Sequence, residues 1–419
     1  MRVKRPSIQP APHHYDLCLI LEGTYPYQIG GIASWVHDLL AGLPEMRIAL
    51  VRIAPQVQER TRAFELPKQV RHFQEITNPD DWQALDQWAS EATNQLPQAS
   101  IYHVVGAGLA GMLGLQAQAR FAKPLILSEH ASYLHELSLG LPQLESGLRV
   151  PQPSSEQRQQ ILATFEDLAC TLYQRADHVI ALDAQTQQRQ IHKGLSKQRS
   201  RVIPNGVSRS SLDAIQANRT PSTHITTPRR VLYVGRIHPI KGTDIFVRAA
   251  LKLSQSIPDL QFDIIGPWDC DSDYIHACKK LGAPLGENLR FLGPKARFDW
   301  GNPPPELLIV PSRSEAQPLV ILEAWLLGVP VIVSDVGGCR AMCEHKGRQG
   351  ALVLPQGSVN AITEAARTLL SNPTLANTLR RNGVRLYRAH FSLEAMQQAY
   401  RELYQQHSNS LHRRARQCA

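Results

Sequence analysis

The sequence alternates short apolar runs, rich in β-branched residues, with longer stretches of helical pattern, and the alternation continues through both halves of the chain. This rhythm is typical of β-α-β units, in which each strand is followed by a helix that packs on a parallel sheet. We therefore predict an α/β fold with doubly wound parallel sheets. The predicted strands are residues 15–21, 48–54, 100–105, 124–129, 177–183 and 201–205, then 230–235, 261–266, 288–293, 307–312, 329–335 and 351–355.

Length and one polar stretch divide this pattern into two domains. A chain of 419 residues exceeds what a single hydrophobic core usually serves. Residues 208–228 hold many Ser, Thr, Asn and Pro residues and few large apolar ones, as linkers do. We predict a first domain over residues 1–207, a linker over 208–228, a second domain over 229–390, and a final helix with a basic tail over 391–419.

Composition argues against several classes of protein. No apolar run reaches the ~20 residues of a membrane-spanning helix, and residues 1–16 lack the apolar stretch of a signal peptide, so we predict a cytoplasmic protein. The seven scattered cysteines fit reduced thiols. Cys339, Cys343 and His345 lack the further ligands of a tetrahedral metal site, so we predict no bound metal.

The net charge of +9 is partly concentrated at the two ends of the chain. Basic ends suit contact with an anionic surface such as a membrane, and they also keep a protein soluble. The sequence does not distinguish between these two interpretations. No interleaving of basic and aromatic residues favours nucleic acid as a partner. The basic residues are Arg2, Lys4 and Arg5 at the start and Arg413, Arg414 and Arg416 at the end.

Two adjacent glycines follow the first predicted strand. Gly30 and Gly31 precede residues 32–40, which have the spacing of an amphipathic helix. Glycines at this position let a ligand approach free backbone N–H groups, and the helix dipole favours an anion there. A tight turn needs the same residues, so the glycine pair supports a phosphate site and a turn equally well.

Two cations follow the first strand of the second half. Arg236 comes directly after an apolar strand and Gly235, and Lys241 stands just before a helical pattern. Ligands of open parallel sheets bind outside the carboxyl ends of the strands, so a long charged side chain at this point turns toward the crevice. An Arg and a Lys placed there can neutralise a diphosphate, although ordinary surface charge at a loop is the simpler alternative.

Residues 307–335 form the most informative stretch, a strand, loop, helix and strand in succession. We expect Pro318 at the first helical position and Gly328 at the helix end. Glu315 then lies on the loop, where it can accept hydrogen bonds from sugar hydroxyls, and Glu323 lies in the second turn of an apolar helix, where it requires a polar partner. Either glutamate can instead serve as a helix-dipole partner or in a structural salt bridge.

Two further features carry weaker signals. His130 ends a strand of the first half, where it can orient a substrate hydroxyl, act as an acid or base, or serve the structure only. The acidic run Asp269, Asp271 and Asp273 follows Gly266 in a polar loop without a converging His or Glu, and we interpret it as solvated.

These motifs together resemble glycosyltransferase family four, whose members are retaining enzymes with the GT-B fold. The resemblance rests on R-x4-K from Arg236 to Lys241, E-x7-E from Glu315 to Glu323, IPNG at residues 203–206, and the glycine pair. It extends from about residue 15 to residue 405.

A closer resemblance is to the PelF-type exopolysaccharide glycosyltransferases. It is carried by EGTYPY at residues 22–27, GGIASWVH at 30–37, YHVVGAGLAG at 102–111 and the long segment at 314–340. Residues 295–310 depart from the family pattern, because they are Pro-rich and compressed where the family usually has a helix before the strand.

The resemblance implies two Rossmann-like domains that face a central cleft, with a UDP-sugar held mainly by the second. It places Arg236 and Lys241 on the diphosphate, Glu323 on the ribose hydroxyls and Glu315 against the donor sugar. The first domain closes the site, and the final helix crosses back to brace that domain. The implied donor-binding residues are Gly30, Gly31, Gly235, Arg236, Lys241, Gly266, Glu315, Gln317, Pro318, Leu319, Val320 and Glu323, and the implied catalytic residues are Arg236, Lys241, Glu315 and His130.

We therefore expect a metal-independent hexosyltransferase that moves glucose from UDP-glucose to a glycan acceptor in exopolysaccharide biosynthesis, with no cofactor besides the donor. The resemblance also implies peripheral association with a polysaccharide export complex at the inner membrane. Two alternatives use the same architecture: a sugar-nucleotide epimerase or phosphorylase, and a non-catalytic assembly subunit. The combination of Arg236, Lys241 and the two glutamates favours the transferase over both.

Overall fold

The computed structural model describes residues 14–54, 61–79, 84–130, 133–140, 154–209, 229–268 and 273–417, with side chains in the last helix described as far as His407. Several predicted features lie outside these residues. They are the basic residues Arg2, Lys4 and Arg5, residues 210–228 of the predicted linker, Asp269 and Asp271 of the acidic run, and the side chains of Arg413, Arg414 and Arg416.

The first half of the chain forms a parallel sheet of seven strands in the order β3-β2-β1-β4-β5-β6-β7. The order reverses between β1 and β4, because the chain builds outward from β1 to β3 and then returns to the other side of β1. The strands are β1 (Tyr15–Glu22), β2 (Ile48–Ala54), β3 (Val70–Thr77), β4 (Ala99–Val105), β5 (Leu125–Ser128), β6 (His178–Ala181) and β7 (Ser200–Val202). The helices are α1 (Gly31–Ala41), α2 (Leu85–Thr93), α3 (Leu109–Phe121), α4 (Tyr133–Ser138), α5 (Ser155–Arg175), α6 (Ala184–His192) and the 3-10 turn η2 (Lys197–Arg199).

The second half forms a parallel sheet of six strands in the order β10-β9-β8-β11-β12-β15, which reverses between β8 and β11. The strands are β8 (Arg229–Val234), β9 (Leu260–Ile265), β10 (Leu289–Gly293), β11 (Leu307–Val310), β12 (Val331–Ser334) and β15 (Leu352–Leu354), with a small hairpin of β13 (Glu344–His345) and β14 (Arg348–Gln349). The helices are η3 (Pro239–Lys241), α8 (Thr243–Ser254), α9 (Asp273–Gly282), η4 (Ala283–Asn288), α10 (Leu319–Leu327), α11 (Cys339–Cys343), α12 (Val359–Ser371), α13 (Pro373–His390) and α14 (Leu393–Gln417).

Helices cover both faces of each sheet, so each sheet has two hydrophobic cores. In the first domain, α1 and α14 pack on one face and α2, α3 and α5 on the other. In the second, α10, α11 and α13 pack on one face and α8 and α12 on the other. The predicted α/β fold with two doubly wound parallel sheets is confirmed. Cys339 and Cys343 are fully buried in the second domain, where they pack as small apolar side chains.

Every predicted strand is present, and β3 is the one large-sheet strand that has no predicted counterpart. It lies at the edge of the first sheet and most of its side chains are half-buried. Its sequence, VRHFQEIT, therefore lacks the apolar run that marks the inner strands. None of the helices in the described part of the chain has the length and apolar character needed to span a membrane.

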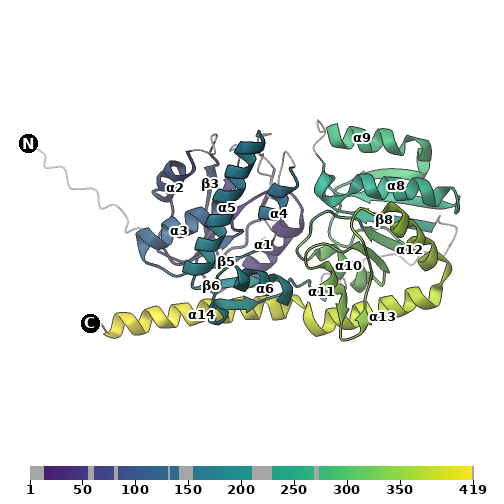
Figure 1. Cartoon of the computed structure of the whole chain (residues 1–419). Coiled ribbons are helices and arrows are strands. Elements are labelled where there is room, and N and C mark those ends of the chain that lie inside the picture. The colour runs from purple at the N-terminus through teal and green to yellow at the C-terminus, as the bar shows by residue number, and fades with distance from the viewer. Residues whose placement is uncertain are drawn as a thin grey trace, which may run out of the picture.

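The final helix returns from the second domain to the first. Figure 1 shows α14 running from the end of α13 beneath the first domain. Its residues Tyr400 and Tyr404 are buried against the first sheet. There the Tyr404 hydroxyl lies 2.7 Å from Nδ1 of His103, and Ser128 Oγ lies 2.9 Å from His103 Nε2 and 2.8 Å from the Tyr400 hydroxyl. A buried chain of hydrogen bonds thus joins α14 to β4 and β5.

The two places where the chain passes between domains lie side by side. Ile203 packs in the first domain and Val207 in the second, while on the return Phe391 packs in the second domain and Met396 in the first. Val207 N–H donates to Phe391 O over 3.1 Å, and the N–H of Leu393 donates to Val207 O over 3.3 Å. The two crossings are therefore hydrogen-bonded to each other.

Candidate functional site

One cleft lies between the domains, at the points where both sheets reverse their strand order. Loops that follow β1 and β5 line it from the first domain, and loops that follow β8, β9, β10 and β11 line it from the second. Parallel α/β sheets bind ligands at such switch points. All predicted site residues line this cleft: Gly30, Gly31, His130, Gly235, Arg236, Lys241, Gly266, Glu315, Gln317, Pro318, Leu319, Val320 and Glu323.

Two helices begin at the cleft without a side-chain cap. The N-caps of α1 and α10 are Gly30 and Pro318, and neither makes a side-chain hydrogen bond to its helix. Elsewhere in the described chain, five helices are capped by the side chains of Ser154, Asp183, Ser358, Asn372 and Ser392, whereas α2, α3, α8 and α11 also lack such a cap. The first N–H groups of α1 and α10 thus lack a side-chain acceptor at the wall of the cleft, and such groups bind anions well.

The glycine pair is not explained by a turn. Gly30 has an extended backbone with φ of −173°, which any residue adopts. A β-carbon added to Gly30 or Gly31 would meet no atom within 4 Å. Neither the backbone nor the packing therefore requires glycine here, and the space over both residues is open on the cleft side.

Arg236 lines the cleft and has an unsatisfied donor. Its Nη2 atom is buried and has no hydrogen-bond partner within the described residues. Nearby, the Nδ1 atom of His238 accepts from Ile240 N–H over 3.3 Å, and burial lowers the pKa of this imidazole to about 3. The neutral His238 fixes the loop between Arg236 and Lys241 without adding a third charge to it.

Lys241 and Glu315 are hydrogen-bonded to each other, with 3.0 Å between Nζ and Oε1. Ser312 donates to the same carboxylate oxygen over 2.8 Å. The Lys241 and Glu315 side chains are only 12% and 9% exposed, so the pair is held at the wall of the cleft. Gly337 lies so close behind that an added β-carbon would meet the Glu315 carbonyl oxygen at 1.6 Å.

Arg313 ties together the two loops that carry this pair. Its guanidinium binds both carboxylate oxygens of Asp244 over 2.8 Å, and its backbone N–H donates to Ile240 O over 2.7 Å. Tyr274 donates to Asp244 over 2.6 Å from the other side. The loop after β8 is thus fixed to the loop after β11, which sets the position of Lys241 relative to Glu315.

Glu323 has a partner that the sequence did not reveal. Its Oε1 atom lies 3.1 Å from Arg297 Nε, and Arg297 Nη1 lies 2.8 Å from Oδ2 of Asp38 on α1. Burial raises the pKa of the Glu323 carboxyl, and the charge of Arg297 opposes that rise. The unusual Pro-rich segment that holds Arg297 was the available signal in the sequence. Local spacing could not show the contact of Arg297 with Glu323, which is distant in the sequence, or its contact with Asp38, which crosses between the domains.

His130 lies against Trp35, with 3.9 Å between the ring centroids. His130 Nε2 and Trp35 Nε1 are both buried, and neither has a hydrogen-bond partner in the described structure. Burial lowers the pKa of His130 to about 3, so the ring is neutral near pH 7. A neutral imidazole can orient a hydroxyl, whereas it is a poor proton donor.

Backbone packing accounts for Gly266. A β-carbon there would meet the Gly235 carbonyl oxygen at 1.9 Å, so these two residues hold the ends of β8 and β9 close together. Pro318 is the N-cap of α10 and not its first helical residue. The helix begins at Leu319, one residue later than predicted. Gly328 ends that helix with φ of 69°, as predicted.

Gln317 joins the domains through the IPNG segment. Its Oε1 accepts from Asn205 N–H over 2.6 Å, and its carbonyl oxygen accepts from the Asn205 amide over 3.0 Å. Its own amide donates to Leu182 O over 3.3 Å. Gln317 thus serves interdomain contact in addition to lining the cleft.

Two family models match the two halves of the chain. Residues 228–372 match the model described as "Glycosyl transferases group 1". Residues 15–93 and 82–198 match a model described as a domain of unknown function, DUF3492.

Curated relatives include D-inositol 3-phosphate glycosyltransferases of actinobacteria. The protein of Rhodococcus opacus is 28% identical over 277 residues, which are 63% of this chain and 58% of the relative. The protein of Salinispora arenicola is 30% identical over 246 residues, 55% of this chain and 52% of the relative. The chain thus spans somewhat more than half the length of these relatives.

Solved structures match almost the whole chain. Sucrose-phosphate synthase from Thermosynechococcus elongatus has a TM-score of 0.71 at 20% identity, covering 94% of this chain and 100% of that one. Anabaena HepE in complex with UDP-glucose has a TM-score of 0.65 at 18% identity, covering 93% and 99%. Residues 228–372 are therefore similar to the group 1 glycosyl transferases, and the chain as a whole has the GT-B fold.

Proposed function

We propose that this protein is a retaining glycosyltransferase that moves a hexose from a UDP-sugar, with UDP-glucose as the first candidate, to a glycan acceptor. The observation that carries the proposal is the set of cations and helix N-termini in the lining of the cleft. Arg236, which has a buried and unsatisfied Nη2, and Lys241 both line it, and α1 and α10 begin there without side-chain caps. This arrangement suits a diphosphate better than any neutral ligand.

The proposed chemistry is the departure of that diphosphate. The bond between the anomeric carbon and the phosphate oxygen breaks, and its electron pair goes to the diphosphate. Arg236 and Lys241 stabilise the added charge from fixed positions, which is the form of electrostatic catalysis that costs no rearrangement during the reaction. The two cations make a divalent metal unnecessary in this scheme.

The acceptor attacks on the face that the diphosphate leaves, so that a single displacement retains the configuration. Its hydroxyl oxygen forms the new bond to the anomeric carbon, and its proton passes to the departing phosphate oxygen. No protein nucleophile is assigned. The neutral His130 and the Gly30–Gly31 loop then hold the sugar from the first domain rather than donate a proton.

The glutamates take the hydroxyl groups of the donor. Glu323 accepts from the ribose, and Glu315 lies against the donor sugar. Support comes from their place in one cleft and from HepE, a protein of similar fold that was solved with UDP-glucose. The choice of glucose as the sugar rests on that likeness and on the resemblance to PelF-type enzymes.

The biological setting is proposed from the same resemblance. We infer a role in exopolysaccharide synthesis at the cytoplasmic face of the membrane, with peripheral attachment to a polymer export complex. The basic ends of the chain suit an anionic membrane surface.

A screen of UDP-, GDP- and ADP-sugars by calorimetry tests the proposal. We expect binding of a UDP-sugar, and then transfer to an added glycan that persists in EDTA. Formation of an epimer or of a sugar phosphate would instead identify an epimerase or a phosphorylase. Binding without turnover on any acceptor would favour an assembly subunit, and failure to bind any of the sugars would overturn the central claim.

A further inference from the structure

The segment between β10 and β11 takes the place of a helix in this chain. Residues 294–306 form no helix, and Pro294, Lys295, Ala296, Arg297 and Trp300 line the cleft. The Phe298 and Trp300 side chains are fully buried in the second core, which fixes the turn between them. The segment thus holds the charged side chain of Arg297 on a fixed stretch of backbone.

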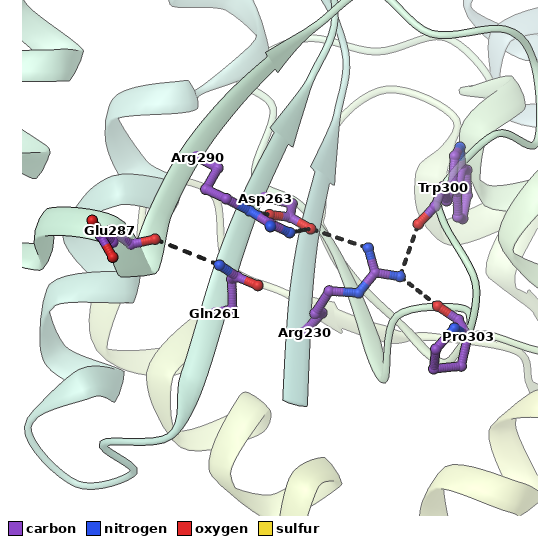
Figure 2. Close-up of polar contacts among 7 residues, drawn as sticks. All are labelled: Arg230, Gln261, Asp263, Glu287, Arg290, Trp300 and Pro303. Carbon is purple, nitrogen blue, oxygen red and sulfur yellow. Dashed lines mark hydrogen bonds and ion pairs between the residues drawn. The ribbon is translucent and has the colours of Figure 1, made fainter. Parts of the chain in front are cut away.

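An ionic cluster on the sheet holds this segment in place, as Figure 2 shows. Asp263 on β9 is completely buried and binds Arg290 through both carboxylate oxygens, over 2.8 and 2.9 Å. Arg230 on β8 binds the same carboxylate over 3.1 Å. Its other terminal nitrogen donates to the carbonyl oxygens of Trp300, over 2.9 Å, and Pro303. The Pro-rich segment is therefore anchored directly to β8 and, through Arg230, to Asp263 on β9.

Arg297 connects three parts of the molecule. It lies on the anchored segment, contacts Glu323 on α10 of the same domain, and contacts Asp38 on α1 of the other domain. Its Nη2 atom is buried and makes no hydrogen bond to any described residue. The guanidinium has five N–H donors in a fixed fork, so it can hold both carboxylates in one geometry.

We propose that Arg297 is a positioning residue, which holds the Glu323 carboxylate ready for the ribose and links it, through Asp38, to closure of the two domains. The proposal rests on the proposed function, since it assigns Glu323 to the ribose. Contact with Arg297 Nε occupies Glu323 Oε1. A carboxylate has about four lone-pair sites, so acceptor capacity remains for the ribose hydroxyls.

Charge explains why Glu323 needs such a partner. Burial favours the protonated carboxyl, and the negative charge of Asp38 raises its pKa further, whereas Arg297 lowers it. His37 on α1 interacts with Asp38 and Arg297, and its pKa is lowered by burial and by Arg297 while Asp38 raises it. A protonated Glu323 offers fewer acceptor sites to the ribose, so loss of Arg297 should make nucleotide binding depend on pH.

The test measures UDP binding by calorimetry from pH 6 to 9 and steady-state transfer with Arg297→Met, Arg297→Lys and Asp38→Asn. We expect Arg297→Met to bind UDP about tenfold or more weakly at pH 7 and to regain affinity as the pH rises, because each unit of pKa elevation above the pH costs about tenfold in ionised carboxylate. Arg297→Lys keeps the charge, so its pH profile should stay that of the wild type.

Asp38→Asn separates the two parts of the proposal. It leaves Arg297 on Glu323, so UDP affinity should change little while kcat falls severalfold. Arg340→Met, which removes an exposed ion pair with Asp335, is the matched control and should change neither quantity.

The outcomes are distinguishable. Wild-type affinity and pH profile in Arg297→Met would overturn the positioning role, and an unchanged kcat in Asp38→Asn would overturn the link to closure. If Arg297→Met does not fold, an altered pH dependence of UDP affinity in Arg297→Lys would also overturn the positioning role. Wild-type protein that binds no UDP would instead remove the proposed function, and the positioning role with it.

Discussion

At the scale of single residues, the strongest features of the cleft are charged side chains that are largely buried. Lys241 and Glu315 form a nearly buried ion pair, and Arg236, which lines the same cleft, has a buried nitrogen without a partner among the described residues. Leaving a buried donor unsatisfied costs free energy, so such a group in a folded protein indicates a binding role. The proposed diphosphate would satisfy it.

Replacing Lys241 by Ala should reduce kcat about 100-fold or more, the size of effect seen when one fixed contact to developing charge is removed. Steady-state transfer assays measure it. Lys252→Ala is the control, because Lys252 is an exposed lysine on α8 that contacts Asn360. Near-normal turnover in Lys241→Ala would remove Lys241 from the proposed mechanism.

Which residues could be predicted from the sequence depends on how local their roles are. Arg236, Lys241 and Glu315 each follow a strand, and the carboxyl ends of parallel strands converge, so their position follows from the sequence. Arg297 and Asp38 could not be predicted in this way. Their contact joins residues far apart in the chain, and it exists only because the two domains meet.

At the scale of elements, the site depends on how neighbouring loops are fixed to each other. Arg313 binds Asp244 through two hydrogen bonds and contacts the loop of Lys241 through its backbone. The position of α10 follows from Gly328 and its apolar residues, which were readable in the sequence. The contacts of Arg313 could not be predicted from the sequence, because an arginine in a loop has the same local pattern whether or not it has a partner.

Replacing Arg313 by Met should lower kcat 10- to 100-fold with the fold retained, because a misplacement of about 1 Å in a catalytic group can cost on the order of 100-fold. Circular dichroism checks the fold, and transfer assays measure the rate. Arg367→Met, which removes an exposed pair with Glu364 on α12, is the matched control. Equal rates in the two variants would show that the tie between the loops has no effect on catalysis.

At the scale of the whole molecule, the attachment of α14 to the first sheet makes stability depend on pH. His103 is fully buried between the hydroxyls of Tyr404 and Ser128, and burial lowers its pKa to about 3. An unfolded histidine has a pKa of about 6.5. Between these values the unfolded chain binds a proton that the folded one does not, so stability present above pH 6.5 is lost as the pH falls toward 3.

We expect urea unfolding, followed by tryptophan fluorescence, to show lower stability at pH 5 than at pH 7, with about 2 kcal/mol of the loss due to His103. His103→Gln should remove that part of the difference, whereas the exposed His276→Gln should leave it intact. The same loss in both variants would assign it to other groups, such as His130 and His238, whose pKa burial also lowers to about 3.

The paired crossings between the domains limit how the cleft can open. Val207 and Leu393 are hydrogen-bonded at the place where the chain passes out of and back into the first domain. Gly206 lies against Ser392 so closely that a β-carbon would meet its carbonyl oxygen at 2.4 Å. Because both passages lie at one place, the domains cannot slide apart without breaking it. An opening that keeps this contact is a rotation about it, which would widen the cleft as a wedge whose apex is the contact of Val207 with Ser392.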